Sequence, residues 1–349
     1  MDSELAFKAV EEAFARAKCL NPHQVFETFY IFGGWGVRMR VVGRRLMERI
    51  GLPLAHLRTD KTHLPPLRLT IDLWDQCETN IPSRIAFVRD DLDLNPIFAT
   101  SADARFISYQ LQHSLTCINV QRSQIIGFVS SAEELSLYEC GRPLHVPLTL
   151  WHNSQAVPVI HAGLVAKNNR GVLFAGSGGT GKSTSAITCA CAGFGYLSDD
   201  LIGLALSDDS FIGHSLYNST FLEPDHLERF PLLRPHALKG KYPYEKKVLI
   251  LLAEILSLRL ERAARIHAIV LPRVTHGLTS RLRPASKRDA LLALAPSSLL
   301  VGQRTPGLHG FNKLARLVEQ TPCHWLELGR ALDEIPCRVE ELLAEVTAN

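Results

Sequence analysis

A glycine-rich stretch in the middle of the chain has the residue types that phosphate binding requires. The segment "GVLFAGSGGTGKST" satisfies the pattern G-x-x-x-x-G-K-[ST] through Gly176, Gly181, Lys182 and Ser183. Glycines let backbone N–H groups surround phosphate oxygens, and the start of a following helix adds partial positive charge. The lysine would reach the outer phosphates and the serine hydroxyl would ligate Mg²⁺. The pattern predicts nucleotide binding but does not specify a reaction.

A pair of adjacent carboxylates follows shortly afterwards, in "GFGYLSDD". A short strand from Tyr196 to Ser198 would deliver Asp199 and Asp200 at its C-terminal end, where the sites of α/β folds form. Two carboxylates allow a division of labour, because one can hold a metal ion while the other accepts a proton from an attacking hydroxyl. The alternative is a purely structural pair that caps a turn or a helix.

A histidine precedes the glycine-rich stretch in "VIHAG". We expect His161 on a strand that pairs next to the strand leading into the loop. A hairpin through "AKNNRG" would then bring the histidine back toward the phosphates. A structural role for a histidine beside an apolar strand is an equally good interpretation.

The elements around these residues are typical of an α/β nucleotide-binding fold. "VLFA" is a short apolar strand, and "KSTSAITCACAG" is a helix that ends at Gly193. From residue 159 onward the chain alternates strand, loop, helix and strand. The loop, with its strand and helix in register, is therefore placed where a nucleotide would bind.

The N-terminal part has a different character. Residues 3–18 have the apolar spacing of an amphipathic helix. The arginine-rich stretch that follows is interpreted as a solvated helix face, or else as a docking surface for an acidic partner or phosphates. Further strands are expected in "PPLRLTIDLW", "RIAFVRDD", "ARFISYQL", "CINVQ" and "QIIGFVS", and helices in "AEELSLYECG" and "PLTLWHNSQ". The basic stretch contains Arg38, Arg40, Arg44, Arg45 and Arg49.

Composition limits the class of protein. The chain has 349 residues, of which 46% are hydrophobic and 21% charged, with a net charge of +3. This is an ordinary globular balance, and the charge alone does not suggest nucleic acid as a partner. The N-terminus does not resemble a signal peptide. The longest apolar stretch, "VLILLAEILSLRL", is shorter than the ~20 residues of a membrane span and is interpreted as a packed helix. We expect a cytoplasmic protein without a membrane partner.

Taken together, the string H-A-x-L-V-A, G-S-G-G-T-G-K-S-T and L-S-D-D resembles the HPr kinase/phosphorylase superfamily. It is most similar to the shorter HPr-kinase-like serine kinases of bacterial gene clusters. The resemblance covers roughly residues 145–345, including late strands in "RIHAIVLP" and "PCHWLELG" and a closing helix in "IPCRVEELLAEV". It implies an α/β core related to phosphoenolpyruvate carboxykinase, with ATP and Mg²⁺ as cofactors.

The resemblance also implies roles for individual residues. Asp199 matches the family carboxylate that acts as the base on the acceptor hydroxyl, Asp200 matches its partner, and His161 matches the histidine near the phosphates. Lys182 completes the catalytic set. The metal ligands would be Ser183, Asp200 and Glu223. The nucleotide would be held by Gly176, Ser177, Gly178, Gly179, Thr180, Gly181, Lys182, Ser183 and Thr184.

The chain departs from the family in two places. The glutamate-rich signature L-E-x-R-G-x-G is absent after the carboxylate pair, so the resemblance does not extend to HPr as the acceptor or to a phosphorylase reaction. Glu223 is instead a candidate metal ligand or a solvated loop residue. The lysine-rich segment 239–247 would be either a lid over phosphates or an exposed loop.

The sequence therefore predicts two domains and one activity. Residues 1–80 would form an N-terminal α+β module that recognises the acceptor, and residues 81–349 the nucleotide-binding catalytic domain. The expected activity is phosphoryl transfer to a hydroxyl, preferably a serine, of a peptide or protein. A small-molecule kinase of the same fold and a nucleotide-hydrolysing or nucleotide-sensing protein are the alternatives. A homo-oligomer is compatible with the sequence.

Overall fold

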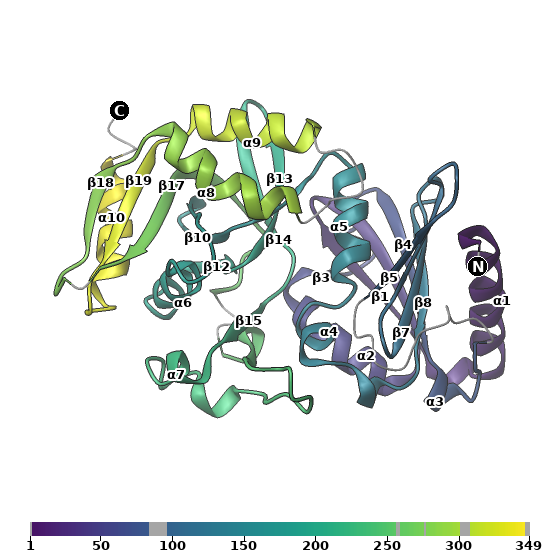
Figure 1. The fold of residues 1–349 in the computed structure, drawn as a ribbon. Helices are drawn as coiled ribbons and strands as arrows, with labels where there is room; N and C mark the ends of the chain where they lie inside the picture. The colour runs from purple at the N-terminus through teal and green to yellow at the C-terminus, as the bar shows by residue number, and fades with distance from the viewer. Residues whose placement is uncertain (1, 84–95, 256–258, 276, 301–307, 346–349) are drawn as a thin grey trace. The chain divides into compact units, whose positions relative to one another are not determined.

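The computed structural model describes residues 2–83, 96–255, 259–275, 277–300 and 308–345 (Figure 1). The chain divides into two compact units, each with its own sheet. The first comprises Met1–Trp151 and Phe221–Ile250, and the second comprises His152–Thr220 and Leu251–Asn349. This division lies elsewhere than the boundary expected after residue 80, because strands on both sides of that residue pair within one sheet.

The first unit is built on a mixed sheet of eight strands in the described residues. The strand order is β3-β1-β2-β4-β8-β7-β6-β5. The pairs β2–β4 and β4–β8 are parallel and the others are antiparallel. The strands are β1 (Val25–Phe32), β2 (Trp35–Val42), β3 (Arg58–Thr59), β4 (Leu67–Asp75), β5 (Ile97–Thr100), β6 (Phe106–Gln110), β7 (Ser114–Asn119) and β8 (Gln124–Val129).

The predicted N-terminal helix is confirmed as α1 (Ser3–Leu20). Its apolar stripe packs against residues of the sheet, including Trp74 and Phe128. Asp2 caps its first turn by accepting a hydrogen bond from the backbone of Glu4 at 3.0 Å. The spacing of the apolar residues thus placed the helix correctly, since that face is what it buries. The buried stripe is Ala6, Phe7, Val10, Phe14 and Ala17.

The arginine-rich stretch is only partly the helix that we expected. Arg38 and Arg40 lie on β2, where they alternate with buried Val37, Met39 and Val41. The alternation has the period of a strand, and it outweighs the local charge. Arg40 also pairs with Asp72 of β4 at 2.7 Å. The remaining arginines, Arg44, Arg45 and Arg49, lie on the helix α2 (Arg44–Gly51).

The other N-terminal expectations can be compared element by element. Strands β4, β6, β7 and β8 confirm four of the five predicted strands, and "RIAFVRDD" lies outside the described residues. The first predicted helix is a 3₁₀ turn (Ala132–Glu134) followed by the short α4 (Leu137–Gly141). The second is α5 (His145–Ser154).

The second unit contains a nine-stranded mixed sheet within the described part of the chain. The order β12-β10-β11-β17-β14-β13-β9 is extended by β19, which pairs with β17, and by β18, which pairs with β19. Its helices include α6 (Lys182–Cys191), α8 (Lys287–Leu300), α9 (Leu308–Gln320) and α10 (Glu334–Glu345). The strands are β9 (Val159–His161), β10 (Gly163–Lys167), β11 (Arg170–Phe174), β12 (Gly195–Ser198), β13 (Leu201–Ser207), β14 (Ser210–Ser215), β17 (Ala263–Val274), β18 (Arg281–Pro284) and β19 (Cys323–Leu328).

The two strands β15 (Ser219–Leu222) and β16 (Val248–Leu251) pair with each other at the ends of the segment that the first unit takes from the middle of the chain. The packed helix predicted for "VLILLAEILSLRL" is therefore wrong, since the run begins as β16 and continues as a 3₁₀ turn (Leu252–Glu254). A short, fully apolar run suits a buried strand as well as a helix, so its period could not separate them.

The described residues include no helix that is both long enough and apolar enough to cross a membrane.

Candidate nucleotide and phosphoryl-transfer site

The glycine-rich loop connects β11 to α6 at one edge of the second unit's sheet. Ala175 follows the strand, and its N–H donates to the carbonyl of Val270 in β17 at 2.9 Å. Gly176 and Gly181 have φ angles of +153° and +107°, which residues with a Cβ atom rarely adopt. A methyl group on Gly181 would also lie 2.3 Å from Leu328. This backbone path therefore requires glycine at both ends of the loop.

The tip of the loop is open. Ser177, Gly178 and Gly179 are exposed, and no atom lies within 4 Å of the position that a methyl group would take on either glycine. Thr180 closes the turn by donating its hydroxyl to the carbonyl of Ser177 at 3.0 Å. The space above the tip is thus accessible to a ligand that approaches the backbone.

Lys182 is folded back over this loop. Its Nζ donates to the carbonyl oxygens of Gly176 at 2.7 Å and Ser177 at 3.0 Å, and the residue is only 6% exposed. Ser183 and Thr184, which follow it in the first turn of α6, are partly exposed. The loop therefore gathers a lysine ammonium and the N-terminus of a ten-residue helix at one place.

The carboxylate pair lies one strand away from the loop. β10 pairs antiparallel with both β11 and β12, so the last two are parallel and end at the same edge of the sheet. A methyl group on Gly163 of β10 would lie 3.5 Å from both the Cβ of Phe174 and the Cα of Asp199. The end of the strand that leads into the loop and the start of the carboxylate pair therefore flank a single glycine.

The two carboxylates have different surroundings. Asp199 is 2% exposed and accepts hydrogen bonds from the hydroxyl of Tyr196 at 2.9 Å and that of Thr220 at 2.8 Å. Asp200 is more open, and its Oδ1 lies 2.8 Å from Nε2 of His161. The side chains of His161 and Asp200 are 28% and 23% exposed. A ligand at the loop could thus reach the second pair more directly than Asp199.

His161 reaches this position by a different route from the one we expected. Its strand, β9, pairs with β13, and His161 is directly opposite Leu201. The hairpin through "AKNNRG" does exist, but it joins β10 to β11. The predicted pairing of the histidine's strand with the loop strand is therefore wrong. His161 lies close to the carboxylate pair because β9 pairs with β13, which begins immediately after Asp200.

Glu223 and the lysine-rich segment belong to the first unit. Glu223 precedes the short helix α7 (Pro224–Leu227), and its carboxylate lies 3.9 Å from Nζ of Lys247. Lys241 lies 3.8 Å from the carboxylate of Glu134. Two lysines of the segment 239–247 are thus engaged with acidic residues of their own unit. Glu223 as a metal ligand stays a prediction. No group of three or more His, Cys, Asp and Glu side chains suited to a metal ion occurs among the described residues.

Sequence reasoning missed the residues that fix the carboxylates. Tyr196 and Ser198 are two residues apart on β12, so their side chains lie on the same face of the strand. The hydroxyl of Ser198 accepts hydrogen bonds from the N–H groups of Asp200 at 3.0 Å and Leu201 at 2.9 Å, which shapes the turn. Thr220 carries no signal in the sequence, because its contact with Asp199 joins residues 21 positions apart.

Comparison with known proteins gives a distant likeness among solved structures. No family model matches the chain, and neither does any curated protein. Among solved structures, the chain is similar to the Hpr(Ser) kinase/phosphatase from Coxiella burnetii, with a TM-score of 0.29 and 13% sequence identity. The match covers 54% of this chain and 96% of that chain. The overlap of the folds at this score is small, and the function proposed below rests on the loop and the carboxylates.

Proposed function

We propose that the chain is a cytoplasmic ATP- and Mg²⁺-dependent kinase that transfers a phosphoryl group to a hydroxyl, preferably a serine, of a peptide or protein. The observation that carries this proposal is the position of Gly163, which is flanked by the end of the loop strand and by Asp199. A phosphate-binding element and a pair of carboxylates are what transfer to a hydroxyl needs within one site, because the reaction depends on positioning and charge neutralisation.

The loop would hold the phosphates through its backbone. Its exposed tip at Gly178 and Gly179 leaves the N–H groups accessible, and α6 adds its partial positive charge. The ammonium of Lys182, held on loop carbonyls in the free protein, would exchange these partners for phosphate oxygens. Ser183 would hold Mg²⁺, which supplies positive charge to the transferred group.

The acceptor hydroxyl needs a base within about 3 Å in the closed complex. The resemblance implies Asp199 for this role, and the surroundings favour a shared arrangement. Asp200 and His161 form the accessible pair, so a proton that leaves the hydroxyl can pass to Asp200 while the histidine stabilises the carboxylate's orientation. Asp199, fixed by two hydroxyl donors, would orient the turn and the acceptor.

The decisive experiment follows γ-labelled phosphate from ATP, with Mg²⁺, into an extract of bacterial peptides, proteins and small molecules. We expect wild type to label a peptide or protein component, and Asp200→Asn and Asp199→Asn to bind ATP with little labelling. Asp208→Asn is the matched control, because Asp208 and Asp209 form an exposed carboxylate pair in the β13–β14 turn of the same unit.

The remaining outcomes identify the alternatives. Label in a small molecule would make the chain a small-molecule kinase. Label released only to water, at a rate that the extract does not change, would contradict the transferase proposal. In that case the loop would serve hydrolysis or nucleotide sensing.

A further inference from the structure

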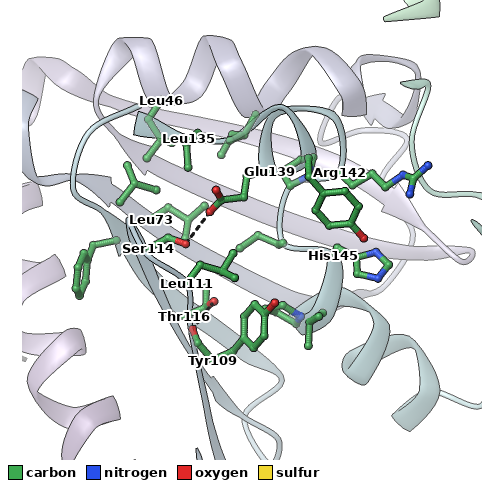
Figure 2. A pocket seen from close by; sticks show the side chains of 18 residues that line it. Leu46, Leu73, Tyr109, Leu111, Ser114, Thr116, Leu135, Glu139, Arg142 and His145 are labelled. Atoms are coloured by element: carbon green, nitrogen blue, oxygen red, sulfur yellow. Dashed lines mark hydrogen bonds between the residues drawn. The ribbon is translucent and has the colours of Figure 1, made fainter. Parts of the chain in front are cut away.

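The first unit has a pocket that the proposed function does not use (Figure 2). Its floor and walls come from β4, β6, β7, β8 and α2, and α4 and the start of α5 border it. The walls are mostly apolar, and the polar lining residues are Tyr109, Ser114, Thr116, Tyr138, Glu139, Arg142 and His145. The guanidinium of Arg142 lies over the rings of Tyr138 and Phe221. The apolar part is formed by Leu46, Ile50, Leu73, Phe128, Val129 and Leu135.

The size of the pocket limits its occupant. The cavity volume is about 60 Å³. A single water needs about 10–15 Å³ on the same measure, so the pocket has room for roughly four to six non-hydrogen atoms. A branched aliphatic group is of this size, whereas a nucleotide is much larger.

Glu139 gives the pocket its chemical character. Its Oε1 accepts a hydrogen bond from the hydroxyl of Ser114 at 2.8 Å, and its Oε2 accepts from the N–H and hydroxyl of Ser136 at 3.1 and 2.9 Å. An ionised carboxylate offers about four acceptor positions, so roughly one remains. No lysine or arginine of the described segments forms an ion pair with Glu139. A negative charge thus borders an apolar pocket with one acceptor position open.

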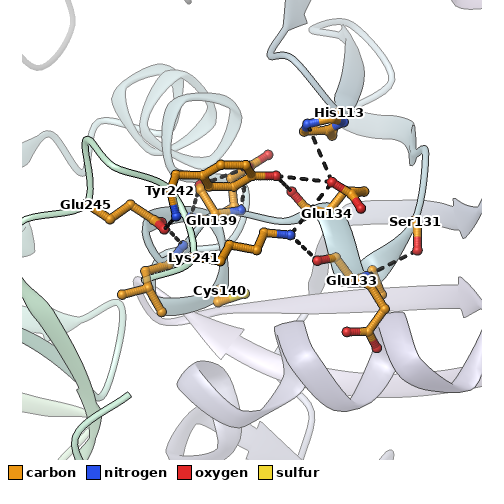
Figure 3. Close-up of polar contacts among 12 residues, drawn as sticks. His113, Ser131, Glu133, Glu134, Glu139, Cys140, Lys241, Tyr242 and Glu245 are labelled. Atoms are coloured by element: carbon orange, nitrogen blue, oxygen red, sulfur yellow. Dashed lines mark hydrogen bonds and ion pairs between the residues drawn. The ribbon is translucent and has the colours of Figure 1, made fainter. Parts of the chain in front are cut away.

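The position of Glu139 is fixed before any ligand arrives. Ser136 and Glu139 form a reciprocal capping box at the start of α4. Residues of the segment 239–247 also form hydrogen bonds with the start of α4 and the turn before it (Figure 3). Glu245 accepts a hydrogen bond from the N–H of Leu137, and the hydroxyl of Tyr242 donates to the carbonyl of Glu134 at 2.8 Å. A preorganised carboxylate loses little entropy when it binds.

The opposite side of the pocket offers a neutral hydroxyl and a strained turn. Burial, together with Tyr138 and Glu139, raises the pKa of Tyr109 to about 12, so its phenol stays protonated at neutral pH. Leu144, at the rim, has a φ of +55°, which is unfavourable for a branched side chain and is common at ligand sites.

We propose that this pocket binds a small aliphatic amine, with a branched hydrocarbon body of roughly four to six carbon atoms inside the apolar walls and an ammonium group that donates to Glu139. The charge of the ligand complements the Glu139 carboxylate, which has no ion-pair partner among the described residues, and the hydrocarbon replaces water against the leucine, valine and phenylalanine side chains. The pocket belongs to the first unit and the loop and the carboxylates to the second, so the inference does not rest on the proposed kinase activity.

The test uses the full chain and three ligands of the same shape. Isothermal titration would compare 3-methylbutylamine, 3-methylbutan-1-ol and 3-methylbutanoate. We expect the amine to bind about tenfold more tightly than the alcohol and the carboxylate not to bind. Glu139→Gln keeps the capping box and should remove the preference for the amine while leaving the alcohol unchanged. Glu12→Gln, which removes an exposed charge on α1, should change nothing.

A variant that fills the cavity with a larger side chain provides a second test. Val129→Phe places a larger side chain against the cavity and should abolish binding of both the amine and the alcohol. If that variant does not fold, the Glu139→Gln comparison still decides. Equal binding of the three ligands, an unchanged amine preference in Glu139→Gln, or no binding of the amine to wild type would overturn the proposal.

Discussion

Lys182 is the residue on which nucleotide binding should depend most. It donates two charge-assisted hydrogen bonds to carbonyl oxygens of the loop in the free protein. We expect Lys182→Ala to weaken ATP binding by about 2–3 kcal/mol, or roughly 30- to 150-fold, because hydrogen bonds to charged groups are worth this much. Calorimetric titration with ATP and Mg²⁺ measures it. Lys167→Ala, which removes an exposed ion pair with Glu340, should leave the affinity unchanged. Similar affinities for both variants would refute the assignment.

Tyr196 should matter through Asp199 rather than through the nucleotide. Its hydroxyl holds Oδ1 of that carboxylate and also lies 3.3 Å from the carbonyl of Ser219. We expect Tyr196→Phe to lower the rate of phosphoryl transfer at least tenfold and to destabilise the fold by about 1–2 kcal/mol, since a buried acceptor loses a donor. Turnover and urea unfolding test the two effects, with Tyr138→Phe, an exposed tyrosine, as the control. A Tyr196→Phe variant with wild-type turnover would show that Asp199 needs no orientation.

At the scale of elements, α5 and β14 carry a pair of buried histidines. Burial lowers the pKa of His152 to about 3, with His214 contributing, and lowers the pKa of His214 to about 4. In the unfolded chain both titrate near 6.5, so below that pH the unfolded state binds more protons than the folded state. The free energy of unfolding should therefore fall between about pH 6.5 and 4, by up to about 1.4 kcal/mol per pH unit for each histidine.

Urea unfolding at pH 7.5, 6.0 and 5.0 measures this dependence. His214→Asn should reduce the slope, and His63→Asn, an exposed histidine paired with Asp60, should not. Equal slopes in wild type and His214→Asn would show that the buried pair does not control acid stability.

The sequence predicted those elements whose signal is local. The loop, its strand and its helix were found because glycine positions, an apolar run and a helix start follow each other within 22 residues of chain, from Arg170 to Cys191. The Asp199–Asp200 pair was found for the same reason. The order of the strands could not be predicted, because β10 pairs with β12 only through long-range contacts such as Leu164 with Ser198. The helix predicted for residues 248–260 was wrong, since the run begins as β16, whose partner β15 is far away in the sequence.

For the whole molecule, the main consequence of the fold is that the first unit is discontinuous. Phe221 and Leu249, from the segment that returns to it, lie where a methyl group on Gly141 would meet their side chains at 2.7 Å. Residues 1–151 alone therefore lack part of their packing. We expect replacement of residues 221–250 by a short glycine–serine linker to make the first unit protease-sensitive, while the second stays protected. Limited proteolysis with mass spectrometry checks this, and equal protection of both units would contradict it.

The strand β10 acts as a spacer of fixed width within the second unit. Neighbouring strands lie about 4.8 Å apart, so one intervening strand holds the ends of β11 and β12 about 10 Å apart. Gly163 keeps that gap free of side chain at the point where both ends meet. The distance between the ends of β11 and β12 is thus set by backbone hydrogen bonds rather than by side-chain packing. Substitutions in the core of this unit would accordingly change its stability before they change the distance between the glycine-rich loop and the carboxylates.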